Sequence, residues 1–206
     1  MTNFQTAREA MVDCQVRPSD VTKYPIIDAL LKTPKEKYVP LEKQSVAYVG
    51  EHITLPDNRV ILDPRIFAKM LDAISIRSEE LVLDVGCSTG YSTAVIAKLA
   101  QAVVALESNI DMAEFARKAL EDEGVDNAIV ISGNLYDGDE KHGLYDVIII
   151  QGGVQKISCL CQDVDPKYCL KMCCCPVYCS LDLFGWVVGA SPCCLCLGCY
   201  NSPFDE

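Results

Sequence analysis

The sequence predicts an α/β fold: a doubly wound, mostly parallel sheet preceded by an N-terminal helical segment. Short apolar runs alternate with helical patterns between residues 81 and 150. The runs are continuous in Val, Ile and Leu rather than alternating with polar residues, which is typical of parallel strands covered on both faces. A chain of 206 residues and 22.6 kDa has room for one such domain and a small appendage.

The first part of the chain predicts helices. Residues 5–50 contain short helical patterns separated by prolines, including an amphipathic run over 24–31 that stops before Pro34. A second pattern begins after Pro64, where the apolar residues of 66–74 recur at spacings of three and four. We therefore expect an N-terminal helical segment over residues 1–75, which caps the substrate side of the molecule.

The second part predicts the alternating core, over residues 76–155. Its strands are expected at 81–85, 102–106, 128–131 and 145–150, and its helices at 93–102 and 112–123. In doubly wound sheets the ligand lies at the carboxyl ends of the strands. The residues that follow these runs are therefore the candidates for a binding site.

Composition restricts the partners. The chain has 29 acidic and 18 basic residues, a net charge of −11, which disfavours a nucleic-acid partner because phosphate backbones need clustered Lys and Arg. Residues 1–20 contain no apolar run, so a cytoplasmic location is expected. Residues 183–204 are uncharged but contain Pro192 and Pro203 and lack flanking basic anchors, so no membrane span is expected.

The last part of the chain, residues 156–206, departs from the rest in composition. Eleven of the 13 cysteines lie in the last 48 residues, where apolar periodicity disappears. Cys159-x-Cys161 and Cys196-x-x-Cys199 have the spacing of metal ligands. Structural zinc sites usually take four ligands from two such pairs, and the neighbouring cysteine doublets and triplet obscure any set of four, so no metal is expected. A shifted reading frame also explains such a tail, and the later strands of the sheet are therefore doubtful.

The stretch 84–91, Asp-Val-Gly-Cys-Ser-Thr-Gly-Tyr, carries the clearest chemical signal. A predicted strand enters a glycine turn and then a helix, and Gly86 and Gly90 let the backbone approach a ligand closely. Glu107 ends the next strand, where a carboxylate can accept hydrogen bonds from both hydroxyls of an adenosine ribose. A nicotinamide dinucleotide and S-adenosylmethionine are both compatible with this pattern.

Asp84 distinguishes the two cofactors. A carboxylate inside the loop would repel the pyrophosphate of a dinucleotide. S-adenosylmethionine carries no phosphate, and its amino group and sulfonium are cationic, so Asp84 suits the methionine end of that molecule. We therefore favour S-adenosylmethionine. The alternative is that the loop only connects a strand to a helix and binds no ligand.

The chain resembles the protein-L-isoaspartate O-methyltransferase family over residues 5–154. The glycine loop with Glu107 is shared by many methyltransferases. More specific are Pro-Lys-Glu-Lys-Tyr-Val-Pro at 34–40, Ala-Tyr at 47–48, His-Ile-Thr-Leu-Pro at 52–56, Ile-Leu-Asp-Pro at 61–64, Gly-Val-Asp-Asn at 124–127 and Ser-Gly-Asn at 132–134. The resemblance implies a Rossmann-like methyltransferase core.

The resemblance also implies an activity. Such enzymes transfer a methyl group from S-adenosylmethionine to the carboxylate of isoaspartyl residues in damaged proteins or peptides, which begins their repair. The acceptor carboxylate is already ionised at neutral pH, so positioning and desolvation suffice and no strong base is needed. The cofactor site implied by loop and resemblance consists of Asp84, Gly86, Cys87, Ser88, Gly90, Glu107, Ser108, Gly133 and Asn134.

Three positions depart from the family pattern. Ser88 replaces a loop glycine, and Asn134 stands where the family usually has Asp beside the adenine. Leu62 occupies the position of a serine associated with substrate handling, so no catalytic residue is assigned, and Asp63 and Pro64 are expected near the substrate. An S-adenosylmethionine-dependent enzyme with another acceptor, and a catalytically silent binding module, are the two alternatives.

Overall fold

The computed structural model describes residues 3–153 and 171–174, the latter as backbone. Its main helices are short. Between residues 12 and 46 the chain also forms a π-helical segment, Val12–Val16, and 3₁₀ segments at Arg17–Ser19, Lys35–Tyr38 and Leu41–Val46. The helices are α1 Phe4–Met11, α2 Tyr24–Lys32, α3 Pro64–Ile74, α4 Tyr91–Ile96 and α5 Ile110–Asp122. The strands are β1 Ile53–Thr54, β2 Val60–Ile61, β3 Leu81–Val85, β4 Ala102–Glu107, β5 Ala128–Ser132, β6 Val147–Ile150 and β7 Lys171–Cys174.

The predicted sheet is confirmed. Five strands lie in the order β5-β4-β3-β6-β7, and every neighbouring pair is parallel. Val85 at the end of β3 lies opposite Leu106 of β4 and Ile150 of β6, and Glu107 lies opposite Ser132 of β5. The carboxyl ends of four strands therefore meet at one edge, which brings the predicted cofactor segments together.

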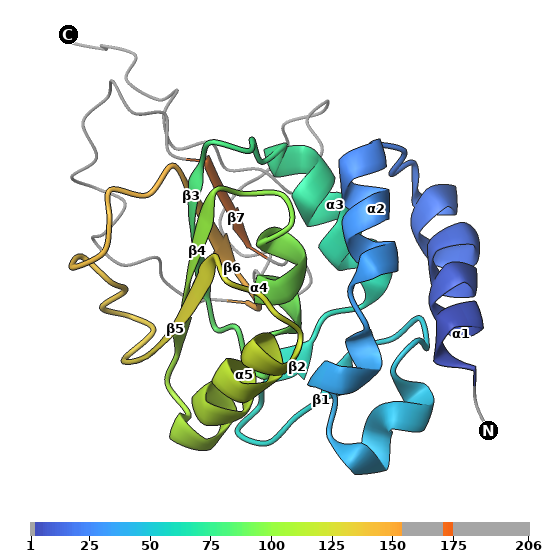
Figure 1. Ribbon diagram of the computed structural model, residues 1–206, viewed down its shortest axis with the longest axis horizontal. Coiled ribbons are helices and arrows are strands. Elements are labelled where there is room, and N and C mark those ends of the chain that lie inside the picture. The colour runs from blue at the N-terminus through green and yellow to red at the C-terminus, as the bar shows by residue number, and fades with distance from the viewer. Residues whose placement is uncertain (1–2, 154–170, 175–206) are drawn as a thin grey trace, which may run out of the picture.

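The described helices pack in layers on one side of the sheet. Helices α3, α4 and α5 lie against it, and α2 and then α1 lie further out on the same side (Figure 1). One buried hydrophobic cluster runs through this side from Met11 and Leu30 to Val82 and Ile149. On the opposite face Leu83, Val85, Val104, Leu106 and Ile148 form a second buried cluster. Burial on both faces explains the continuous apolar runs.

Helix α4 ends earlier than its sequence pattern predicts. The pattern extends to residue 102, but the helix ends at Ile96 and tighter turns follow. Asn127, next to β5, donates its side-chain amide to the carbonyl oxygens of Ala97 at 2.8 Å and Ala100 at 3.3 Å. These carbonyls are thus satisfied from outside the helix, and the chain can turn directly into β4.

Strand β7 lies where the sequence pattern predicts none. Lys171–Cys174 contains no β-branched residue, yet its backbone pairs in parallel with β6, Val147 opposite Lys171 and Ile150 opposite Cys174. The free edge of β6 supplies the unpaired backbone groups that this pairing satisfies. The sheet thus extends beyond the four strands that the sequence supports.

The remaining expectations for the cysteine-rich segment lie outside the described residues. These are its shifted reading frame and the two cysteine pairs at 159–161 and 196–199. Within the described part, Cys14 and Cys87 are free thiols, and no cluster of His, Cys, Asp and Glu side chains could hold a metal ion. No helix in that part is long and apolar enough to span a membrane.

A lysine is buried where the N-terminal helices meet the core. Lys35 is fully inaccessible, and its Nζ has no hydrogen-bond partner among the described residues. The ammonium lies 5.4 Å from the centroid of the Tyr91 ring, a cation–π contact that offsets part of its desolvation. Burial nevertheless lowers the pKa of Lys35 to about 8, against an opposing effect of Asp63. At neutral pH the buried charge of Lys35 therefore lowers the stability of the folded state.

Lys35→Met is expected to stabilise the protein at pH 7 by about 3 kcal/mol, the equivalent of the lowered pKa. Between about pH 8 and the ordinary lysine pKa of 10.5, the unfolded chain binds a proton that the folded chain lacks. Stability of the wild type consequently rises with pH in that interval, and the advantage of the variant shrinks. Urea unfolding at pH 7 and pH 10 measures both effects.

Lys69→Met is the matched control, because Lys69 is exposed on α3. It is expected to change stability by less than about 0.5 kcal/mol at either pH. A Lys35→Met protein that is less stable than the wild type at pH 7 would contradict the assignment of Lys35 as a destabilising buried charge.

Candidate functional site

The loop from Gly86 to Gly90 joins β3 to α4 at the carboxyl edge of the sheet. Gly86 and Cys87 donate their backbone N–H groups to the Leu106 carbonyl oxygen of β4, at 2.8 and 3.4 Å. Gly90 donates its N–H to the Cys87 carbonyl oxygen at 2.9 Å and closes the turn. The loop is thus fixed to the end of the neighbouring strand before the helix begins.

The two loop glycines serve different purposes. Both have a positive φ, +77° at Gly86 and +89° at Gly90. A Cβ at Gly86 would meet only Leu135 Cδ1, at 3.7 Å, so space is open beside this residue. A Cβ at Gly90 would lie 3.0 Å from Ala116 Cβ and 3.3 Å from its Cα. Gly86 therefore leaves room for a ligand, whereas Gly90 lets α4 begin against α5.

Ser88 adopts a conformation that favours glycine. Its φ is +52°, in the left-handed region, and its hydroxyl donates to the Gly86 carbonyl oxygen at 3.3 Å. Its backbone N–H donates to Glu107 Oε2 at 2.8 Å. The bond to Glu107 holds the loop in a shape that costs a residue with a Cβ about 1 kcal/mol.

Asp84 is buried beneath the loop, and its carboxylate is engaged by the protein itself. Oδ2 accepts from the hydroxyls of Ser92 and Thr93, both at 2.7 Å, and Oδ1 accepts from Gln151 Nε2 at 2.7 Å. Burial raises the pKa of Asp84 despite these donors. The carboxylate links α4 to the end of β6, and a direct role toward a cofactor stays a prediction.

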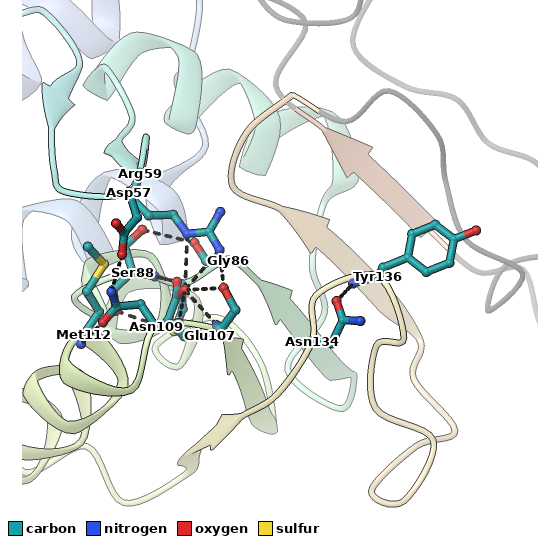
Figure 2. A network of polar contacts seen from close by, with 11 residues as sticks. Asp57, Arg59, Gly86, Ser88, Glu107, Asn109, Met112, Asn134 and Tyr136 are labelled. Carbon is teal, nitrogen blue, oxygen red and sulfur yellow. Dashed lines mark hydrogen bonds and ion pairs between the residues drawn. The ribbon is translucent and has the colours of Figure 1, made fainter.

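Glu107 is the most connected side chain of the site (Figure 2). The side chain is fully buried. In addition to the Ser88 N–H on Oε2, its Oε1 accepts from the backbone N–H groups of Ser108 at 2.8 Å and Asn109 at 3.0 Å. Arg59 donates Nε at 3.2 Å and Nη2 at 3.1 Å to the same Oε1.

Arg59 comes from the hairpin that joins β1 and β2, a segment outside the site predicted from the sequence. Asp57 and Asn58 form the tip, with φ values of +53° and +56°. Asn109 donates its side-chain amide to Asp57 and so ties the tip to the start of α5. The Pro-Asp-Asn sequence at 56–58 is a turn signal that could have located the hairpin, but no local pattern predicts its contact with Glu107.

An open pocket of about 550 Å³ lies between this hairpin and α5. Asp57, Arg59, Ser108, Asn109, Ile110 and Asp111 line it. Ser108, which the sequence assigns to the cofactor site, accepts a hydrogen bond from Arg59 Nη2 on its hydroxyl at 2.7 Å. The pocket therefore begins directly beside the carboxylate that is predicted to hold a ribose.

Asn134 and Gly133 follow β5. Gly133 donates its N–H to the Glu107 carbonyl oxygen at 3.0 Å, so this residue is adjacent to the site. Asn134 is exposed and lies apart from the Glu107 network, in the loop after β5 (Figure 2). It donates to Asp137 at 2.9 Å and accepts from the Tyr136 N–H at 3.0 Å. Its predicted contact with an adenine stays a prediction.

The segment 61–64 lies next to the loop. Leu62 is buried and lines a small cavity of about 10 Å³ with Gly86, Cys87 and Tyr91, space for one water molecule. Asp63 is also buried, and its carboxylate caps α3 through the Arg65 N–H at 2.7 Å and pairs with Arg65 Nη2 at 2.6 Å. Although burial opposes ionisation, the bonds from Arg65 lower the pKa of Asp63.

Cys87 does not have the environment of a nucleophile. The thiol is buried, and burial raises its pKa well above the usual value, with the charges of Asp84 and Glu107 adding to the effect. A thiol that stays protonated at neutral pH is a poor nucleophile. Cys87 therefore packs as a small apolar side chain in the loop.

The loop fits S-adenosylmethionine at two places. The side of Gly86 is open, and the buried hydroxyl of Thr89 has no hydrogen-bond partner among the described residues. An unpaired buried hydroxyl in a ligand loop is satisfied when a ligand supplies the partner. The pocket beside Glu107 has the size of a nucleoside site, and its acidic rim disfavours a pyrophosphate.

Comparisons with known proteins show what the chain is similar to. The family model for protein-L-isoaspartate(D-aspartate) O-methyltransferase matches residues 6–163. The protein-L-isoaspartate O-methyltransferase of Koribacter versatilis is 32% identical over 154 residues, which cover 75% of this chain and 69% of the relative. That of Methanoculleus marisnigri is 32% identical over 150 residues, 73% of this chain and 68% of the relative.

Solved structures show the same fold. A protein-L-isoaspartate O-methyltransferase superposes with a TM-score of 0.68 at 22% identity, over 81% of this chain and 55% of that one. A Plasmodium falciparum protein assigned to the same activity, in complex with S-adenosyl-L-homocysteine, gives 0.66 at 18% identity, over 84% and 85%.

Ser88→Gly is expected to raise the free energy of unfolding by about 0.5 kcal/mol. Relief of the left-handed strain exceeds the entropy that glycine gains in the unfolded chain. Thermal unfolding measures the change.

Ser88→Ala is the matched control, because it removes the hydroxyl but keeps the Cβ at a positive φ. We expect it to be no more stable than the wild type. Equal stabilisation by both substitutions would show that the hydroxyl, rather than the backbone conformation, causes the strain.

Proposed function

The chain belongs to the protein-L-isoaspartate(D-aspartate) O-methyltransferase family, and we propose that its described site performs that reaction with the residues assembled at the carboxyl edge of the sheet. The activity is methyl transfer from S-adenosylmethionine to the carboxylate of isoaspartyl residues in proteins or peptides. The observation that carries the assignment of the site is the junction of the Gly86–Gly90 loop with Glu107.

S-adenosylmethionine supplies an electrophilic methyl group on a sulfonium when it is bound. The residues proposed to hold it are the open backbone at Gly86, the Thr89 hydroxyl and the Glu107 carboxylate, which accepts from the ribose hydroxyls. Asp84 supports the loop through α4 and Gln151. Its buried negative charge also favours a cationic group nearby.

The acceptor side is proposed to lie near Leu62, which borders Gly86 and Cys87. The cavity that these residues line holds only one water molecule, so the acceptor carboxylate lies beside it rather than inside it. The acceptor oxygen is a carboxylate that is already ionised, so the protein needs to place it and exclude water rather than remove a proton. Leu62 is apolar and buried, which suits exclusion of water. The His52 ring accepts the Asp63 N–H at 3.0 Å and fixes the backbone behind Leu62.

The reaction is tested with labelled S-adenosylmethionine and an isoaspartyl peptide, with the aspartyl peptide of the same sequence as control. We expect base-labile label on the isoaspartyl peptide alone, because a methyl ester hydrolyses readily in base. Label on neither peptide would contradict the proposed acceptor.

Glu107→Gln tests whether Glu107 contributes to cofactor binding. The amide places an N–H₂ against the Ser88 N–H or the ribose hydroxyls, so affinity for S-adenosylhomocysteine is expected to fall at least tenfold. Calorimetric titration measures the Kd, and thermal unfolding shows whether the variant is folded. Unchanged affinity in a folded Glu107→Gln protein would remove Glu107 from the cofactor site.

A further inference from the structure

Arg59 pairs with Glu107, the carboxylate that is proposed to bind the ribose of the cofactor. Its guanidinium reaches from the β1–β2 hairpin and donates twice to Glu107 Oε1, with a third bond from Nη2 to the Ser108 hydroxyl. Glu107 is fully buried, while a quarter of the Arg59 side chain is exposed. The cation thus covers the acid from the solvent side (Figure 2).

The bonds to Glu107 are unevenly shared between its two oxygens. Among the described residues, Oε1 accepts from the N–H groups of Ser108 and Asn109, from the Ser108 hydroxyl at 3.3 Å and twice from Arg59. Within the same part of the chain, Oε2 accepts from the Ser88 N–H alone. Arg59 is the donor that comes from the hairpin rather than from the loop or the start of α5. A ribose whose two hydroxyls bind both oxygens therefore has to displace Arg59 from Oε1.

The tip of the hairpin that carries Arg59 is less firmly held than its strands. The strands bury Ile53 and Ile61 in the core, whereas both tip residues, Asp57 and Asn58, are exposed and in the left-handed region. Among the described residues, the side-chain bonds that tie the tip to the core are those of Arg59 and the Asn109–Asp57 bond. An exposed tip with few bonds moves at low cost while the strands stay packed.

We propose that Arg59 is a latch: it occupies the ribose-binding face of Glu107 when no cofactor is bound, and the β1–β2 hairpin must release it before the cofactor binds. The latch rests on the proposed function, because it regulates the same site. The measured affinity for the cofactor then equals the affinity of the open form multiplied by the fraction of molecules that are open.

Arg59→Met removes the charge and keeps most of the stem. We expect it to lower the Kd for S-adenosylhomocysteine about tenfold relative to the wild type in calorimetric titrations at 50 mM KCl. S-adenosylhomocysteine is the probe because it lacks the cationic sulfonium. Arg59→Gln is expected to lie between the two. Arg17→Met is the control, since Arg17 also pairs with a carboxylate, Asp13, but on the exposed surface of the N-terminal segment.

An NMR titration provides a second measurement that needs no variant. The Arg59 Nε–H donates to Glu107 Oε1 at 3.2 Å, so its signal is expected to shift when S-adenosylhomocysteine is added to the wild type. An unchanged Arg59 Nε–H signal at saturating S-adenosylhomocysteine would overturn the latch, even if the variants do not fold.

The outcomes separate the latch from the function. Binding by the wild type with equal or weaker binding by Arg59→Met overturns the latch and leaves the proposed function in place. No binding by either protein, with both folded, overturns the cofactor site and the latch together. Tighter binding by Arg59→Met than by the wild type supports both.

Discussion

The site depends on a single buried carboxylate, that of Glu107. Three segments that are distant in sequence donate to it: the loop after β3, the first turn of α5 and the hairpin before α3. Because the side chain has no exposure, each of these bonds is made in a low dielectric and an unpaired donor would be costly. The carboxylate therefore sets the position of the loop even before any ligand binds.

The fold could be predicted from the sequence because its strands are buried on both faces. Continuous runs such as Val103–Leu106 have no polar alternation, and Gly86 directly after β3 marks the turn to α4. The early end of α4 could not be predicted, because it depends on Asn127, about 30 residues away in the chain. Strand β7 depends on a free sheet edge, which is a property of the tertiary structure.

The site was predictable in its backbone and less so in its side chains. The residue types predicted acidic and small side chains near a cofactor. They did not show which of these side chains form hydrogen bonds to other residues of the protein instead. Asp84 is engaged by Ser92, Thr93 and Gln151, and Asp63 by the first turn of α3. Arg59 was missed because it lies 48 residues before Glu107 and belongs to no local motif. Contacts between distant segments decided each case.

The capping of α3 by Asp63 has a consequence for the residue before it. His52 binds the Asp63 N–H, and the Asp63 carboxylate binds the Arg65 N–H, so the main chain beside position 62 is held by groups other than the Leu62 side chain. The side chain at position 62 can consequently change its chemistry while the backbone keeps its course. If the acceptor lies near Leu62, as proposed, one residue can vary with the acceptor while the backbone around it and the cofactor loop are retained.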